Sequence, residues 1–133
     1  GNVGSILRSA AAFGYQQVIA LRGTAALWSP KVLRAGMGAH FSLHLVEDVP
    51  ASALEQLHLP LFATSSHRGD WLHQLAPSGP CAWLIGNEGS GLGPDAAQRA
   101  TRWVQIAQPG GQESLNAAVA AAICLYSTRQ STP

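Results

Sequence analysis

The chain has 133 residues, 47% of them apolar, which is the usual size of one domain and enough to bury a core without disulfides. This composition excludes an intrinsically disordered chain. Only 11% of the residues are charged, 8 basic against 7 acidic, so the net charge of +1 provides no general affinity for nucleic acids. We therefore expect residues 1–133 to form a single domain, in which any contact with nucleic acid comes from a local patch.

The sequence contains neither a membrane span nor a secretion signal. Its longest apolar run, Ala117 to Tyr126, is about half the length needed to cross a bilayer. The first residues lack the basic and apolar regions of a signal peptide. Cys81 and Cys124 lie far apart in apolar runs, which favours buried reduced thiols over a disulfide or a zinc site. We expect a reducing compartment, the cytoplasm, with the mitochondrial matrix as the alternative.

Helices and strands are predicted to alternate along the chain. Capping residues, prolines and glycines delimit four helices: Val3 to Phe13, Lys31 to Ala35, one that starts at Gly93-Pro94-Asp95, and one from near Ser114 to about Thr128. Five apolar runs have the length of strands: Gln17 to Leu21, Phe41 to Val46, Leu59 to Thr64, Cys81 to Ile85 and Trp103 to Ile106. Most of these runs are nearly continuous. We therefore predict an α/β fold, a parallel sheet with helices on both faces.

The loop after the predicted strand Cys81 to Ile85 is the first candidate site. In parallel sheets, ligands bind beyond the carboxyl ends of the strands. Residues 86–93 include four glycines, which allow a backbone to approach a ligand closely. Glu88 follows the buried strand directly, so its carboxylate must find a partner or a ligand or remain solvated. A simple turn into the next helix is the alternative for the glycines.

The loop after Ile106 and the N-terminal helix supply the other polar candidates. Ser114 is expected to cap the last helix. Asn116 would lie in the first turn of that helix, where its amide can donate and accept beside free backbone N–H groups. Asn2 and Arg8 flank the first turns of the N-terminal helix. Arg8 belongs to a solvated face or, if it points into a cleft at the strand ends, suits a phosphate group.

Several other chemistries are excluded by the sequence. The only lysine, Lys31, follows Pro30, so there is no phosphate-binding loop of the Gly-Lys-Ser/Thr type, and no serine lies in a nucleophile elbow. The five histidines lack the spacing of a metal site. The segment Gly91 to Ala96 matches a dinucleotide fingerprint, with Glu113 about 20 residues further on, but it begins too far after the strand. An oxidoreductase is therefore the weakest alternative, and no metal is expected.

Three segments in a fixed order resemble the motifs of the SpoU family of RNA 2'-O-ribose methyltransferases, in the SPOUT superfamily. They are Asn2 to Ala10, Trp83 to Leu92, and Val104 to Ile106 followed by Glu113 to Ala120. Each segment alone is weak evidence, whereas three with this order and spacing are specific. The chain departs from the family at Ala107, where many members have proline, and it lacks the motif residues that precede Asn2.

The resemblance implies a fold and a site. The C-terminal segment would thread through a loop to form a trefoil knot, an exception to the usual rule against threading. S-adenosylmethionine would bind in that knot at Thr64, Gly86, Asn87, Ile106, Leu115 and Asn116. A ribose 2'-oxygen would attack its methyl group, with Arg8 activating the hydroxyl and Asn2, Glu88, Ser114 and Asn116 shaping the site. Because a guanidinium with a pKa above 12 is a poor base, Arg8 could instead grip a phosphate and stabilise the developing alkoxide.

The resemblance also implies partners. Family members act on ribosomal or transfer RNA and work as homodimers, and burial in a dimer would explain the low charged fraction. Many carry an RNA-binding region ahead of this domain, and we expect this chain to be a part that lacks it. The alternative function is a knotted module that has lost catalysis and serves in RNA binding or assembly.

Overall fold

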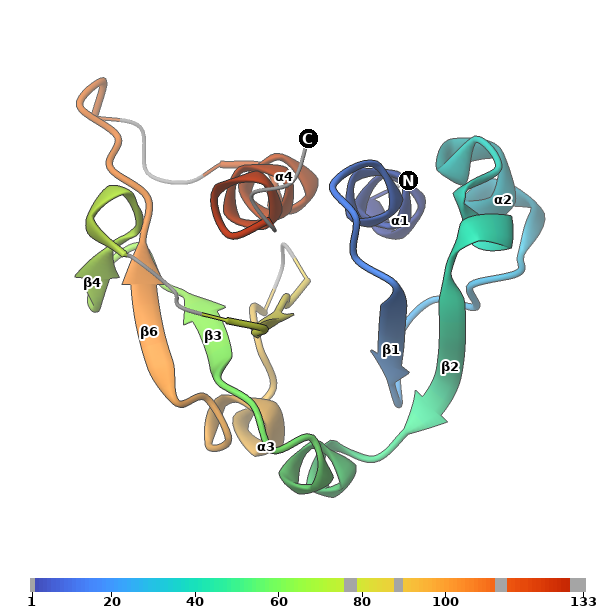
Figure 1. Cartoon of the computed structure of the whole chain (residues 1–133), viewed down its shortest axis with the longest axis horizontal. Coiled ribbons are helices and arrows are strands. Elements are labelled where there is room, and N and C mark those ends of the chain that lie inside the picture. Colours follow the sequence, from blue (N-terminus) through green and yellow to red (C-terminus); the bar gives the residue numbers. More distant parts are fainter. Residues whose placement is uncertain (1, 76–78, 88–89, 112–114, 130–133) are drawn as a thin grey trace. The chain divides into compact units, whose positions relative to one another are not determined.

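The computed structural model describes residues 2–75, 79–87, 90–111 and 115–129 (Figure 1). The chain divides into two compact units. The N-terminal unit ends at Ala51 and also takes in Arg129, and the C-terminal unit is Ser52–Thr128. No helix within the described ranges is long and apolar enough to span a bilayer.

The N-terminal unit combines two parallel strands with two helices and a 3-10 turn. Its elements are α1 (Asn2–Ala12), β1 (Gln17–Leu21), α2 (Pro30–Gly36), η1 (Ala39–Ser42) and β2 (His44–Val49). Strand β1 pairs in parallel with β2, and Gln17 lies opposite His44. The predicted strand Gln17 to Leu21 is confirmed.

Close packing of α1 against α2 forms the core of this unit (Figure 1). A Cβ atom at Gly4 would lie 2.7 Å from the carbonyl oxygen of Val32 and would also meet the side chain of Ala35, so only glycine fits. Leu7, Val32 and Ala39 form the buried cluster between these elements. Ser29 caps α2, as predicted, with Val32 N–H donating to its Oγ at 3.4 Å and Pro30 at the first helical position.

The predicted strand Phe41 to Val46 is wrong at its start. Met37 and Gly38 both have positive φ, 51° and 88°, which ends α2 and turns the chain into the short helix η1. Phe41 therefore lies in a helical turn, where 82% of its surface is exposed, and the strand begins only at His44. The apolar run indicated a strand, but the left-handed residues before it set the backbone.

The C-terminal unit contains a four-stranded sheet with strand order β4-β6-β3-β5, in which all pairings are parallel. Its elements are η2 (Ala51–Gln56, starting at the boundary), β3 (Leu61–Thr64), β4 (Asp70–Trp71), η3 (Leu72–Gln74), β5 (Ala82–Leu84), α3 (Pro94–Ala97), β6 (Arg102–Gln105) and α4 (Ala117–Ser127). The predicted α/β fold with parallel pairing is confirmed. The strands form two sheets, whereas a single sheet was expected.

Helix α4 packs against β5 and η3 and closes the core of the C-terminal unit (Figure 1). Phe62, Leu72, Val104 and Cys124 are buried together there. Strand β4 was not predicted, because two exposed residues give no apolar pattern. The predicted start of the last helix near Ser114 is also wrong, since α4 begins at Ala117.

Candidate functional site

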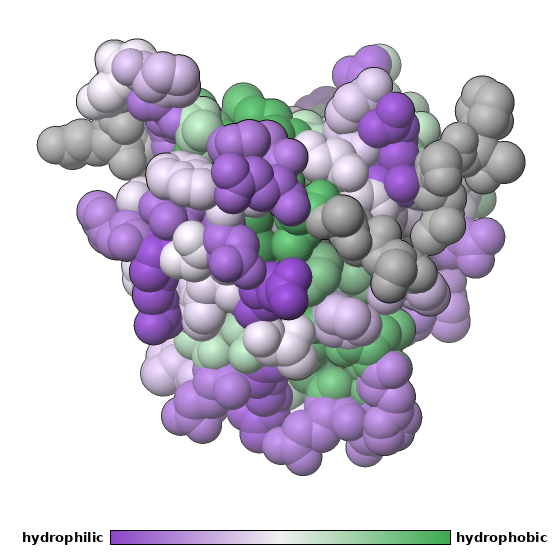
Figure 2. All heavy atoms as spheres, turned by 60° about the vertical axis from the view of Figure 1, so that its left-hand side comes forward, coloured by the Kyte–Doolittle hydropathy of each residue, from purple (hydrophilic) through white to green (hydrophobic). Residues whose placement is uncertain are grey.

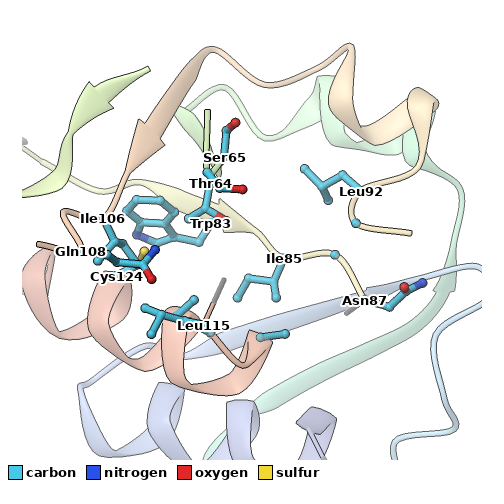
Figure 3. Close-up of a pocket in the computed structure, with 16 residues that line it drawn as sticks. Thr64, Ser65, Trp83, Ile85, Asn87, Leu92, Ile106, Gln108, Leu115 and Cys124 are labelled. Atoms are coloured by element: carbon cyan, nitrogen blue, oxygen red, sulfur yellow. The ribbon is translucent and has the colours of Figure 1, made fainter. Parts of the chain in front are cut away.

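A cavity lies where the neighbouring parallel strands β6, β3 and β5 end. Because these strands run in the same direction, the loops that follow Thr64, Leu84 and Gln105 meet at one edge of the sheet. The cavity has a volume of about 350 Å³. Pockets of a few hundred cubic ångströms at this edge are typical ligand sites in α/β proteins. Figure 3 shows the side chains that surround it.

Residues from the three loops and from α4 line the cavity. Five of the residues that the sequence assigned to a cofactor are among them: Thr64, Gly86, Asn87, Ile106 and Leu115. The remaining lining residues are Ser65, Ser66, Trp83, Ile85, Gly91, Leu92, Gln108, Ala117, Ala120, Ala121 and Cys124. The structure thus brings together segments that are up to 60 positions apart in the chain.

The glycine-containing loop after β5 is folded tightly onto itself. The Oδ1 atom of Asn87 accepts hydrogen bonds from Ser90 N–H at 2.7 Å and from Ser90 Oγ at 3.1 Å. Gly91 N–H donates to the carbonyl oxygen of Asn87 at 2.9 Å, and Gly91 has a φ of 68°. A Cβ atom at Gly86 would overlap the backbone of Gly91 and Leu92. This loop therefore forms one wall of the cavity with backbone groups.

Asn116 has a different place from the one predicted. It is the N-cap of α4, and its Oδ1 accepts from Ala118 N–H at 2.8 Å and from Val119 N–H at 3.2 Å. The prediction that Ser114 caps this helix is therefore wrong. Asparagine and serine cap equally well, so the sequence alone did not separate the two positions. Capping fixes the first turn of α4, and Leu115, directly before the cap, lies in the cavity wall.

The apolar wall of the cavity is anchored by hydrogen bonds to Thr128. Trp83 Nε1 donates to Thr128 Oγ1 at 2.8 Å, and the Thr128 hydroxyl donates to the carbonyl oxygen of Cys124 at 2.9 Å. The rings of Trp83 and Phe62 meet edge to face, 5.3 Å apart. Burial raises the pKa of the Cys124 thiol to about 12, so this side chain is neutral. Burial likewise raises the pKa of Cys81.

Gln108 contributes a buried polar atom to the cavity lining. Its Oε1 is buried in the cavity lining and accepts no hydrogen bond from the described residues. A buried acceptor without a partner costs about 1–3 kcal/mol, so a ligand that brings a donor to this point gains affinity. Together with the backbone wall at Gly86, this acceptor fits a ligand that carries N–H groups.

The other predicted site residues lie elsewhere or are not described. Asn2 and Arg8 are on α1 in the N-terminal unit, where Arg8 is exposed. Glu88 and Ser114 lie outside the described residues. Arg68, in the loop after β3, is exposed and its guanidinium lies 4.2 Å above the ring of Trp103. Among the described residues there is no cluster of His, Cys, Asp or Glu that could hold a metal ion.

Sequence reasoning missed several residues of the cavity. Ser65, Ser66 and Gln108 follow predicted strands directly, and the rule that ligands bind at strand ends could have found them. Trp83 and Cys124 gave no such signal, because the face of a strand or helix that meets a cavity depends on packing.

The fold and the cavity define an α/β protein that binds a small ligand at the carboxyl ends of parallel strands. The sequence profile of the SpoU rRNA methylase family matches residues 1–126. The chain belongs to this family.

Curated relatives and solved structures are consistent with this family assignment. The chain is 42% identical over 130 residues to "Ribosomal RNA small subunit methyltransferase G 2" of Syntrophobacter fumaroxidans, covering 98% of this chain and 25% of that protein. It is 32% identical to the 23S rRNA (guanosine(2553)-2'-O)-methyltransferase RlmP of Bacillus subtilis, covering 97% of this chain and 53% of the relative. The chain thus spans between a quarter and about half of these proteins.

Among solved structures, the chain resembles the SpoU methyltransferase AviRb from Streptomyces viridochromogenes, determined in complex with the cofactor AdoMet. The TM-score is 0.85 and the identity 33%, and the match covers 95% of this chain and 53% of the other.

Proposed function

We propose that this chain is the catalytic part of an enzyme that transfers a methyl group from S-adenosylmethionine (AdoMet) to a ribose 2'-hydroxyl of ribosomal or transfer RNA. The observation that carries the proposal is the cavity at the ends of β3, β5 and β6, together with the AdoMet complex of AviRb. The names of other relatives, such as the 2'-O-methyltransferase RlmP, supply the reaction.

The cavity residues fit AdoMet as a ligand. The unpaired Oε1 of Gln108 can accept from an N–H group such as an amino substituent. The backbone wall at Gly86 leaves room for a ligand where a side chain would not fit. Thr64, Gly86, Asn87, Ile106 and Leu115 would hold the cofactor, with Asn116 fixing the first turn of α4. When bound, AdoMet supplies a methyl group on a sulfonium, which is a good leaving group.

The reaction also requires activation of the ribose 2'-hydroxyl, which is poorly acidic and must be aligned with the methyl group. Arg8 is exposed and forms no ion pair with another described residue, so its guanidinium is available to a phosphate or to a developing alkoxide. Asn2, Glu88, Ser114 and Asn116 are the other residues to which the proposal gives a part in catalysis. In this proposal Arg8 acts as an anion-stabilising group rather than as a base.

A C-terminal trefoil knot and a homodimer belong to the same proposal. The trefoil knot rests on the resemblance of the three motifs to the SpoU family and on the likeness to the solved SpoU methyltransferase AviRb. Val119, Ile123 and Tyr126 are exposed and share one face of α4, which supports a contact with a second copy. Figure 2 shows hydrophobic residues exposed between hydrophilic ones on one side of the molecule. Sedimentation equilibrium would measure the mass in solution.

The proposed compartment is the cytoplasm, with the mitochondrial matrix as the alternative. Both cysteines are free in the structure, Cys124 buried and Cys81 half-buried. Thiols that remain unpaired are typical of reducing compartments.

The decisive experiment combines binding and turnover. Calorimetry with AdoMet and with NAD is expected to detect binding of AdoMet alone. Arg8→Ala is expected to abolish methyl transfer to RNA while AdoMet affinity stays within about twofold. Arg22→Ala is the matched control, because Arg22 is an exposed arginine of the same unit that pairs with Asp48.

The possible outcomes separate the candidate functions. Normal turnover by Arg8→Ala would contradict the role given to that residue. AdoMet binding without transfer by the unmodified chain to any RNA would favour the inactive binding module. Mapping 2'-O-methyl positions lost in cells without the gene would identify the substrate.

A further inference from the structure

Two aromatic side chains are displayed on the surface of the N-terminal unit. Trp28 is 47% exposed and Phe41 is 82% exposed, with ring centroids 6.1 Å apart in an edge arrangement. We call this pair the aromatic platform. Large aromatic groups are normally buried, so two that lie together in solvent indicate a binding surface.

The backbone that carries Trp28 is held from both sides. Leu27 is 1% exposed; its N–H donates to Glu47 Oε2 at 3.0 Å, and its carbonyl oxygen accepts from His40 Nε2 at 2.6 Å. The ring of His40 also packs against Trp28, with centroids 4.9 Å apart. Trp28 therefore projects from an ordered, hydrogen-bonded base.

A glycine makes room for this base. A Cβ atom at Gly36 would lie 2.8 Å from Cε1 of His40, so a side chain at this position would displace the imidazole. His40 packs against Trp28 and is followed directly by Phe41, so one buried residue anchors the backbone beside both members of the aromatic platform. Pre-organised aromatic groups lose little entropy when a partner binds.

Two cations lie on α2, the helix that begins two residues after Trp28. Lys31 and Arg34 are exposed, lie three positions apart on α2, and form no ion pair within the described part of the chain. The two acids of the N-terminal unit are engaged otherwise, Glu47 with the backbone of Leu27 and Asp48 with Arg22 at 3.7 Å. The helix that follows Trp28 therefore carries two exposed positive charges.

The C-terminal unit has the opposite balance. Between Ser52 and Thr128 the basic residues are Arg68, Arg99 and Arg102, against the acidic residues Glu55, Asp70, Glu88, Asp95 and Glu113. The net charge of +1 thus conceals a basic N-terminal unit, and an anionic partner is attracted to that unit.

We propose that the aromatic platform stacks unpaired nucleobases of the RNA substrate while Lys31 and Arg34 contact the adjoining phosphates. The proposal rests on the proposed function, since it names where that enzyme holds its RNA. Aromatic side chains with flanking cations are the usual means of binding single strands, because every base offers a flat face. A duplex hides those faces, and an apolar protein surface would leave both cations without anions. Single-stranded RNA therefore fits the chemistry best.

The test measures binding of a fluorescently labelled single-stranded oligouridine to the chain. Trp28→Ala and Phe41→Ala are each expected to weaken binding about tenfold to a hundredfold. Lys31→Ala is expected to weaken the salt dependence of binding, so that the negative slope of log affinity against log salt concentration decreases in magnitude by about 0.7. Trp71→Ala is the matched control, an exposed tryptophan of the C-terminal unit whose loss is expected to change nothing. Trp28→Phe keeps a flat aromatic ring at the same position of the backbone and is expected to retain most of the affinity for oligouridine.

AdoMet calorimetry on the same variants separates this proposal from the proposed function. If AdoMet binds normally and Phe41→Ala still binds oligouridine as the unmodified chain does, the aromatic platform is refuted and the methyltransferase stands. If AdoMet fails to bind but Trp28→Ala and Phe41→Ala weaken the binding of oligouridine, the aromatic platform is supported and the proposed methyltransferase function is contradicted. A change of sedimentation mass in Phe41→Ala, with oligouridine affinity unchanged, would instead make this surface an interface between copies and overturn the proposal.

Discussion

The N-terminal and C-terminal units share parallel strands packed against helices, yet one pair of aromatic residues in each is placed differently. In the N-terminal unit Trp28 and Phe41 project into solvent from a hydrogen-bonded base. In the C-terminal unit Trp83 and Phe62 turn inward and support the wall of a cavity. The difference lies in the connections: a rigid turn presents side chains, whereas glycine-containing loops at strand ends enclose space.

The comparison teaches that one architecture can divide recognition between two kinds of site. A closed cavity selects a small ligand by volume and by a few polar atoms. An open aromatic surface accepts a longer, charged chain with little dependence on its sequence. Each unit depends on a glycine at a close approach, and these glycines allow the units to be perturbed separately.

The largest effect is expected for Gly86→Ala in the C-terminal unit. The new Cβ would overlap the backbone of Gly91 and Leu92, so the loop must move and the cavity wall is lost. We expect AdoMet affinity to fall more than a hundredfold and the free energy of unfolding to fall by about 3 kcal/mol. Gly93→Ala is the control from the same loop, since a Cβ there meets nothing within 4 Å. Equal AdoMet binding by the two variants, measured by calorimetry, would contradict the backbone wall.

Gly4→Ala is the corresponding change in the N-terminal unit. The added methyl group would meet Ala35 and the carbonyl oxygen of Val32, forcing α1 away from α2. We expect urea denaturation to give a loss of about 2 kcal/mol, with much less effect on AdoMet affinity than Gly86→Ala has. Ser5→Ala, a change at an exposed position of α1, serves as the control. If Gly4→Ala abolished AdoMet binding while the chain remained folded, the division between the units would be wrong.

The pH dependence of Cys124 separates the units in another way, because only the C-terminal unit contains cysteine. Burial raises the pKa of this thiol from 9.0 to about 12, so its contribution is fully present below pH 9 and is lost as pH rises toward 12. The loss amounts to about 1.4 kcal/mol of unfolding free energy per pH unit above 9. Urea titrations at pH 8, 9.5 and 10.5 are expected to show a shallower decline for Cys124→Ala. Identical declines in both proteins would show that the thiol is accessible to solvent.

The smallest effects are expected at the two helix caps. Asn116→Ala removes an acceptor for two N–H groups at 2.8 and 3.2 Å and should cost about 1 kcal/mol. Ser29→Ala removes one long bond of 3.4 Å and should cost less, about 0.5 kcal/mol. Only Asn116→Ala should also weaken AdoMet binding, because it loosens the turn that holds Leu115. Asn116→Asp keeps the acceptor, and a loss of stability as large as that of Asn116→Ala would argue against the capping role.

The fold could be predicted wherever local pattern and tertiary packing agree. The strand Gln17–Leu21 and the capped start of α2 follow from short-range signals, an apolar run and a Ser-Pro pair. Strand β4 is too short to produce such a signal. Phe41 was misassigned because the two left-handed residues before η1 outweigh β propensity.

The candidate site was predictable in its loops and less so in its side chains. Parallel strands place their carboxyl ends at one edge, which pointed to the loops, and the resemblance to the SpoU family then singled out Thr64, Gly86 and Ile106. Gln108 and Cys124 were missed, because the direction of a side chain depends on packing between distant segments. The hydrogen bonds that hold the backbone beside Trp28 were also not predicted, since one of them joins Leu27 to Glu47, 20 positions away.

The unpaired oxygen of Gln108 has a consequence for selectivity. An occupant that brings no donor to this atom leaves it buried and unpaired, which costs about 1–3 kcal/mol, or roughly one to two orders of magnitude in Kd. Replacing a ligand's amino group by an oxo group would remove the donor and place two acceptors face to face. The cavity would therefore bind deaminated counterparts of its ligand more weakly without any steric barrier.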